Sequence, residues 1–180
     1  MRTWTLRDYV FAAFMTIGIA IASVVTVPLT LGIPLPGVRT IVWAPFGGIS
    51  LTLGMARLQR SGSVALMIGT LALLLSRISF VITAFLGVSL IVTELIMLFR
   101  GGFRGKTNRL LGNIIFFAST TVSGAIIGAY TAAPGFTQWL TQPWIIVPMT
   151  LLSGGAGAIG GWLGERIVQQ LRRAGKLEAD

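Results

Sequence analysis

The chain has no cysteine and no histidine, and only five of its 180 residues are acidic. Without cysteine there are no disulfides and no thiol chemistry, and without histidine there are no His-ligated metals, imidazole proton relays or Ser-His proteases. Acid and base catalysis usually needs paired tunable groups, and Glu94 is the one acid within a predicted span. We therefore expect no enzymatic activity, no metal site and no cofactor.

Charge of either sign is also scarce, because charged residues are 11% of the chain and hydrophobic residues 54%. Soluble proteins contain about 25% charged residues. A membrane-spanning helix needs about 20 mostly apolar residues, and several uncharged runs approach or exceed that length. The sequence predicts an all-α integral membrane protein whose residues 1–180 form one six-helix bundle, with spans near 9–27, 41–56, 62–76, 78–99, 110–130 and 144–164.

Most basic residues fall into clusters between these spans, and only Arg39 and Arg77 lie apart from them. Basic residues accumulate in cytoplasmic loops, so we expect both termini in the cytoplasm and a multi-pass protein in a prokaryotic cell membrane. The basic residues lie at helix ends, which favours contact with anionic membrane lipids over nucleic-acid binding. The clusters are Arg2/Arg7, Arg57/Arg60, Arg100/Arg104/Lys106/Arg109 and Arg166/Arg172/Arg173/Lys176.

Two features near the fourth span imitate functional sites. The segment from Gly101 to Thr107 resembles a phosphate-binding loop, but its glycines enclose three residues where that motif requires four, and it does not follow a strand. We interpret it as a basic turn. Glu94 is an acid within a span, and intramembrane acids are commonly functional; we expect it instead to pair with the basic loop that begins at Arg100.

Proline and glycine are concentrated in segments predicted to lie on the side of the membrane opposite the basic clusters. Residues 28–37 and 132–143 are rich in both, which predicts ordered loops. The second and third spans are short, and Pro45-Phe46-Gly47-Gly48 is expected to interrupt the second. Broken helices are tolerated in a membrane where they line a cavity, so we expect a cavity in the outer half of the bundle.

Aromatic, amide and arginine side chains map to the same outer side and form the predicted substrate-binding set. Trp and Tyr at that level can be a membrane-interface belt. Together with arginines and amides, they also suit a small planar solute that stacks on indole. The outer side has no acid, so a neutral or anionic ligand fits better than a strongly cationic one. The set is Arg39, Trp43, Arg77, Tyr130, Gln138, Trp139, Gln142 and Trp144.

Four stretches of the chain resemble a known family. They are Leu6-Arg7-Asp8, Arg60-Ser61-Gly62, Thr93-Glu94-Leu95 with the loop 100–106, and the segment from Gly160 to Lys176. Their order and spacing are similar to those of the substrate-binding S components of energy-coupling factor (ECF) vitamin transporters, nearest to the thiamine-precursor and Treponema/Streptococcus-type subfamilies.

The resemblance implies a protein that captures a vitamin and works with a transmembrane coupling subunit and two ATPase subunits. It implies a partner-docking stripe on the first span, where Ala12, Thr16 and Ala20 depart from the family's Ala-x-x-x-Ala signature. We expect a substrate-capture subunit of an ECF-type importer. The alternatives are a small membrane scaffold or assembly protein without a small-molecule ligand and, less favoured, a self-sufficient transporter or channel.

Overall fold

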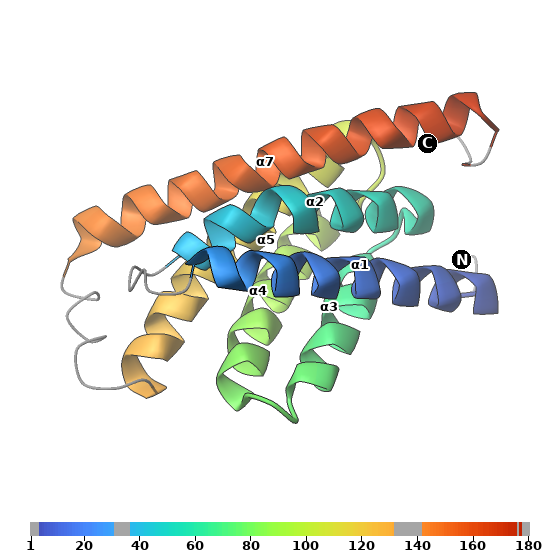
Figure 1. Cartoon of the computed structure of the whole chain (residues 1–180). Coiled ribbons are helices and arrows are strands. Elements are labelled where there is room, and N and C mark those ends of the chain that lie inside the picture. Colours follow the sequence, from blue (N-terminus) through green and yellow to red (C-terminus); the bar gives the residue numbers. More distant parts are fainter. Residues whose placement is uncertain (1–3, 31–36, 132–141, 176, 178–180) are drawn as a thin grey trace.

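The computed structural model describes residues 4–30, 37–131, 142–175 and 177. These residues form α-helices and connecting turns (Figure 1). Five of the helices are long and apolar enough to cross a membrane, which makes the chain an all-helical protein of the multi-pass membrane type. The helices are α1 (Leu6–Thr30), α2 (Val38–Leu58), α3 (Ser63–Leu75), α4 (Phe80–Phe99), α5 (Lys106–Thr131) and α7 (Pro143–Arg173).

The helices form a closed ring in the order α1, α2, α7, α5, α4, α3, in which α2 also contacts α5 and α3. Helices α1, α2 and α7 run alongside one another in Figure 1, and the other three lie obliquely beneath them. Hydroxyl and indole groups link several of the neighbours. Ser89 Oγ on α4 lies 2.9 Å from Ser123 Oγ on α5, and Thr121 Oγ1 donates to Ser153 Oγ on α7 at 2.6 Å. Such bonds hold apolar helices together where hydrophobic burial gives no net drive.

Glycines let α7 approach its two neighbours. A Cβ on Gly160 would lie 2.6 Å from the Pro45 carbonyl oxygen on α2, and one on Gly157 would lie 2.6 Å from Cδ2 of Phe117 on α5. Both distances are too short for any side chain. Gly157 and Gly160 therefore serve packing within the chain, on the faces of α7 that meet α5 and α2.

The predicted interruption of the second span at Pro45 is wrong, and α7 is longer than the span predicted within it. Helix α2 continues through Pro45 and both following glycines. Gly48 permits close packing against α7, since a Cβ on Gly48 would lie 3.2 Å from Cα of Gly160. Helix α7 continues nine residues past Gly164, and Glu165 within that extension is buried. Tertiary contacts thus override the local breakers.

The third predicted span is the exception in length. Helix α3 has 13 residues, which gives about 20 Å at 1.5 Å per residue, against about 30 Å for the hydrocarbon core. Its end at Leu75 is followed directly by the turn to α4. Five of the six predicted spans therefore correspond to helices that are long and apolar enough to cross a membrane. The remaining one, α3, is a shorter apolar helix in the ring.

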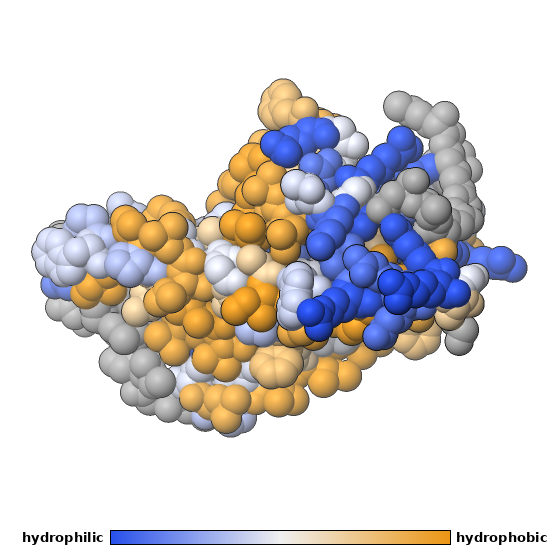
Figure 2. Space-filling view, turned by 90° about the horizontal axis from the view of Figure 1, so that it is seen from above, coloured by the Kyte–Doolittle hydropathy of each residue, from blue (hydrophilic) through white to orange (hydrophobic). Residues whose placement is uncertain are grey.

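The described residues of the basic clusters gather at one end of the bundle, which we call the basic end. It holds the starts of α1, α3 and α5 and the ends of α2, α4 and α7 (Figure 1). There the Arg60 guanidinium lies 5.6 Å from the ring centroid of Trp4. Figure 2 shows the strongly hydrophilic side chains collected on one side of the visible face, beside an apolar surface. Arg39 and Arg77 lie at the opposite end, as the pattern predicted.

One ion pair is buried within this framework. Arg109 on α5 and Glu165 on α7 are 0% and 2% exposed, and two guanidinium nitrogens of Arg109 donate to the two carboxylate oxygens. Asn113, one turn further along α5, donates to Thr52 Oγ1 on α2 at 2.8 Å. These polar groups tie α2, α5 and α7 together near the basic end. Such paired geometry is required for charge removed from water.

Candidate functional site

A cavity of about 310 Å³ opens inside the ring, at the end opposite the basic end. Five helices contribute to it, and its volume lies at the lower limit for small-molecule sites. Most lining side chains are apolar, with several hydroxyls among them. The lining residues are Ala20, Ser23, Val24, Thr26, Thr30, Arg39, Thr40, Trp43, Leu71, Leu75, Ile82, Phe85, Leu86 and Thr120.

Trp43 forms one wall of the cavity and is held in place by its neighbours. Its indole Nε1 donates to the Ile19 carbonyl oxygen at 3.3 Å, and its ring meets Phe117 and Phe116 edge-on, with centroids 5.2 and 6.3 Å away. The side chain is only 9% exposed. A fixed indole with its N–H already bonded offers its apolar ring surface to whatever occupies the cavity.

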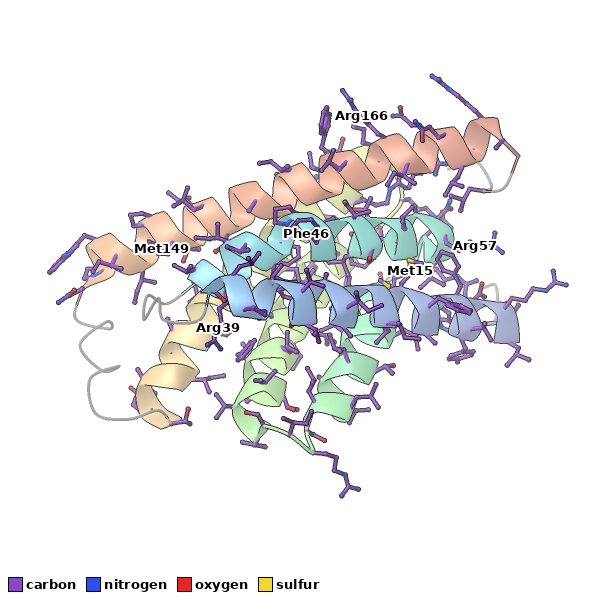
Figure 3. All side chains as sticks on the ribbon, in the orientation of Figure 1. Met15, Arg39, Phe46, Arg57, Met149 and Arg166 are labelled. Carbon is purple, nitrogen blue, oxygen red and sulfur yellow. The ribbon has the colours of Figure 1, made fainter. Side chains whose placement is uncertain are left out.

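Arg39 supplies the charge at this site. It lies in the first turn of α2, follows the left-handed Gly37 at φ 84°, and is exposed while also lining the cavity. Figure 3 shows its side chain extending from the start of α2 toward the side where α4 and α5 lie. Among the described lining residues Arg39 alone is charged. The site therefore offers a guanidinium to an anionic or carbonyl group of a ligand. The described lining residues include no carboxylate that could bind a cation.

Three hydroxyl side chains on α1 line the cavity but were not among the site residues predicted from the sequence. Ser23, Thr26 and Thr30 follow one another at three- and four-residue spacing, so they share one face of the helix. Thr26 Oγ1 donates to the Ala22 carbonyl at 2.8 Å, which leaves its oxygen lone pairs as acceptors. The regular spacing of hydroxyls in an otherwise apolar run was the available signal.

The other predicted site residues lie elsewhere. Arg77 is exposed in the turn between α3 and α4, outside the cavity lining. Tyr130 and Trp144 are 79% and 67% exposed, as a lipid-facing belt would require. Gln142 is half-buried at the N-cap of α7. Gln138 and Trp139 lie outside the described residues, so the structure brings together Arg39 and Trp43 from the predicted set.

The predicted docking stripe on α1 faces inward in this conformation. Ala12 and Thr16 are 2% and 3% exposed, and Thr16 Oγ1 donates to the Met67 carbonyl on α3 at 3.0 Å. Ala20 lines the cavity. A partner that binds α1 in this conformation would contact its exposed large side chains, such as Phe14 and Ile21.

Glu94 has a structural partner other than the predicted one. Its two carboxylate oxygens accept from the backbone N–H of Gly62 at 2.7 Å and of Ala65 at 2.9 Å. These amides belong to the start of α3, whose N-cap residue Gly62 has no side chain to accept them. An acid at a helix N-terminus is also favoured by the helix dipole. Within the described residues, Glu94 thus caps α3 from α4 and does not pair with the basic loop at Arg100.

The glycine-rich segment after α4 is a turn. Gly101, Gly102 and Gly105 all have positive φ, and the Asn108 side chain donates to the Gly102 carbonyl at 2.9 Å. Phe103 between them is fully buried. This arrangement anchors the turn to the bundle, in line with its interpretation as a structural connection.

Comparison of the chain with protein-family models, with curated proteins and with solved structures finds no match.

Proposed function

We propose that the chain is the substrate-capture subunit of an ECF-type importer, which binds a small vitamin or vitamin precursor in the cavity and delivers it inward with a transmembrane coupling subunit and two ATPase subunits. The observation that carries the proposal is the cavity itself, which five helices line at the end opposite the basic end. Its position suits entry from outside the cell, given the predicted orientation.

The lining narrows the class of ligand. Trp43 provides a rigid aromatic wall, Arg39 a charged donor, and the threonines of α1 acceptors. A planar heterocycle with a carboxylate, phosphate or carbonyl group would use all three. We propose a neutral or anionic molecule of this kind, because a cation would lie beside Arg39 with no carboxylate among the described lining residues.

The test is thermal unfolding of the purified full chain with a panel of vitamins and heterocyclic precursors. A ligand at 100 times its Kd stabilises the folded protein by about 2.7 kcal/mol. Trp43→Ala should weaken the binding of the stabilising compound by about 1–3 kcal/mol if the ring stacks on it. Arg39→Gln should weaken the binding of anionic compounds selectively.

The matched controls are Tyr130→Ala and Arg77→Gln, which remove an aromatic and an arginine from the same end of the bundle but outside the cavity. Both should bind the compound as the unaltered chain does. If no compound stabilises the protein, the alternative of a membrane scaffold gains support. Equal losses in Trp43→Ala and Tyr130→Ala would show that the cavity is not the binding site.

A further inference from the structure

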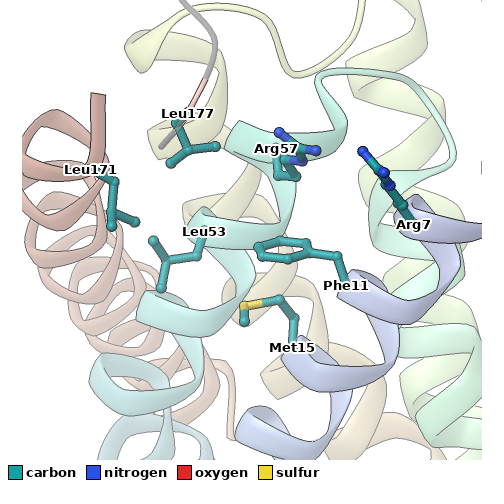
Figure 4. Close-up of a pocket in the computed structure, with 7 residues that line it drawn as sticks. All are labelled: Arg7, Phe11, Met15, Leu53, Arg57, Leu171 and Leu177. Atoms are coloured by element: carbon teal, nitrogen blue, oxygen red, sulfur yellow. The ribbon is translucent and has the colours of Figure 1, made fainter. Parts of the chain in front are cut away.

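A second pocket, of about 350 Å³, lies at the basic end, remote from the proposed substrate cavity. It is formed over α2 between α1 and the end of α7 (Figure 4). Two arginines stand at one edge of it, and the remaining side chains are apolar. The lining residues are Arg7, Phe11, Met15, Leu53, Arg57, Leu171 and Leu177.

The lining is ordered along the helices by chemical type. On α1, Arg7, Phe11 and Met15 follow at four-residue intervals, so they share one face with the charge nearest the helix start. On α2, Leu53 and Arg57 repeat the order, with the charge nearest the helix end. One turn spans about 5.4 Å, so both helices place a guanidinium at the basic end and apolar surface one to two turns deeper.

The two guanidinium groups have no acidic partner within the described residues. Within the described part of the chain, neither Arg7 nor Arg57 has a hydrogen bond or an ion pair. The acid nearest in sequence, Asp8, accepts from the backbone N–H and the hydroxyl of Thr5, at 3.0 and 2.9 Å. No acid is among the described lining residues. Two like charges beside an apolar hollow are stabilised by an anion that both can bind.

We infer that this pocket binds one anionic phospholipid of the adjoining leaflet, with its phosphate between Arg7 and Arg57 and an acyl chain along Phe11, Met15 and Leu53. Basic pockets between helices at the cytoplasmic side are suited to acidic headgroups. A soluble anion would use only the two arginines. The five apolar lining residues then require an occupant with a hydrocarbon part.

The experiment is native mass spectrometry of the delipidated full chain, titrated in detergent with dioleoyl phosphatidylglycerol or dioleoyl phosphatidylcholine. The unaltered chain should retain one phosphatidylglycerol in preference to phosphatidylcholine. An arginine directly beside an anionic headgroup contributes roughly fivefold to the affinity, so Arg7→Gln/Arg57→Gln should lower retention by roughly 25-fold. Thermal unfolding of each variant checks that it is folded.

The matched control is Arg100→Gln/Arg104→Gln, which removes the same charge from exposed positions at the basic end but outside this pocket. Its retention should change by less than about twofold, because these two arginines do not line the pocket and their attraction for the headgroup falls off with distance. Equal losses in the two double variants would overturn the inference, because attraction would then follow net charge alone.

Two further arms separate the lipid from other occupants. Glycerol 1-phosphate, a headgroup without acyl chains, should not displace the lipid at equal concentration; displacement would identify a soluble phosphate ligand and overturn the inference. Glu178→Gln/Asp180→Asn removes the acids that follow Leu177 in sequence and should leave retention unchanged. Retention that appears only in this variant would identify the chain's own acidic end as the occupant.

Discussion

The approach of α7 to α2 at Gly160 gives the sharpest prediction for the fold. A Cβ at this position would lie 2.6 and 2.7 Å from the carbonyl oxygens of Pro45 and Ala44, and 3.0 Å from Cα of Pro45. All three are backbone atoms of a helix, so they cannot rotate away as a side chain would. The helices must separate. Overpacking of this kind typically costs about 1–3 kcal/mol, and we expect the upper end of that range for Gly160→Ala.

A gain in helix propensity opposes this cost. Replacing glycine by alanine within a helix stabilises it by about 1 kcal/mol, so the net loss in the free energy of unfolding should be about 2 kcal/mol. Gly155 on the same helix is the control, because it is exposed and a Cβ there would meet nothing within 4 Å. Gly155→Ala should therefore keep the propensity gain of about 1 kcal/mol.

The assay is equilibrium unfolding of both variants by sodium dodecyl sulfate in mixed micelles, followed by circular dichroism. The two alanine variants should differ by about 3 kcal/mol. The reasoning would be refuted by a Gly160→Ala protein as stable as the unaltered chain, since α2 and α7 would then have room that the structure does not show. It would also fail if Gly155→Ala lost as much stability as Gly160→Ala.

The same unfolding assay tests the polar contacts. Glu165→Gln leaves the buried Arg109 without its carboxylate and should destabilise the protein by about 3–5 kcal/mol, whereas Arg109→Met/Glu165→Met should recover most of that loss; a double variant weaker than the single one would contradict this. Glu94→Gln keeps one acceptor for the two amides at the start of α3 and removes the charge, so we expect a loss of about 1–2 kcal/mol. Unchanged stability would show that water caps α3 equally well.

The class of fold could be predicted from the sequence because it depends on composition and on runs. Long uncharged segments fix where helices can cross a membrane, and the basic clusters between them predict which helix ends lie together. The structure gathers the described residues of these clusters at one end and leaves Arg39 and Arg77 at the other. The prediction that Pro45 interrupts the second span was wrong. Helix α2 continues through Pro45, and Gly48 packs against α7, a contact that local propensity does not describe.

The sequence predicted only part of the candidate site, because the packing of the helices decides which residues line a cavity. The sequence predicted that eight residues lie on one side of the membrane. That level does not determine which of them face a cavity inside the bundle and which face outward. Only the closing of the helix ring separates Arg39 and Trp43, which line the cavity, from Tyr130 and Trp144, which are exposed. The threonines of α1 enter the site because α1 and α2 pack side by side.

By itself, the sequence determined an all-helical membrane protein with a basic end, since both properties follow from the identity and order of residues along the chain. The tertiary structure decided which polar groups meet. It paired Arg109 with Glu165, turned Glu94 into the cap of α3, and left Arg7 and Arg57 together at the rim of an apolar pocket. Such contacts join residues up to 56 positions apart, and they depend on how the helices pack around the ring.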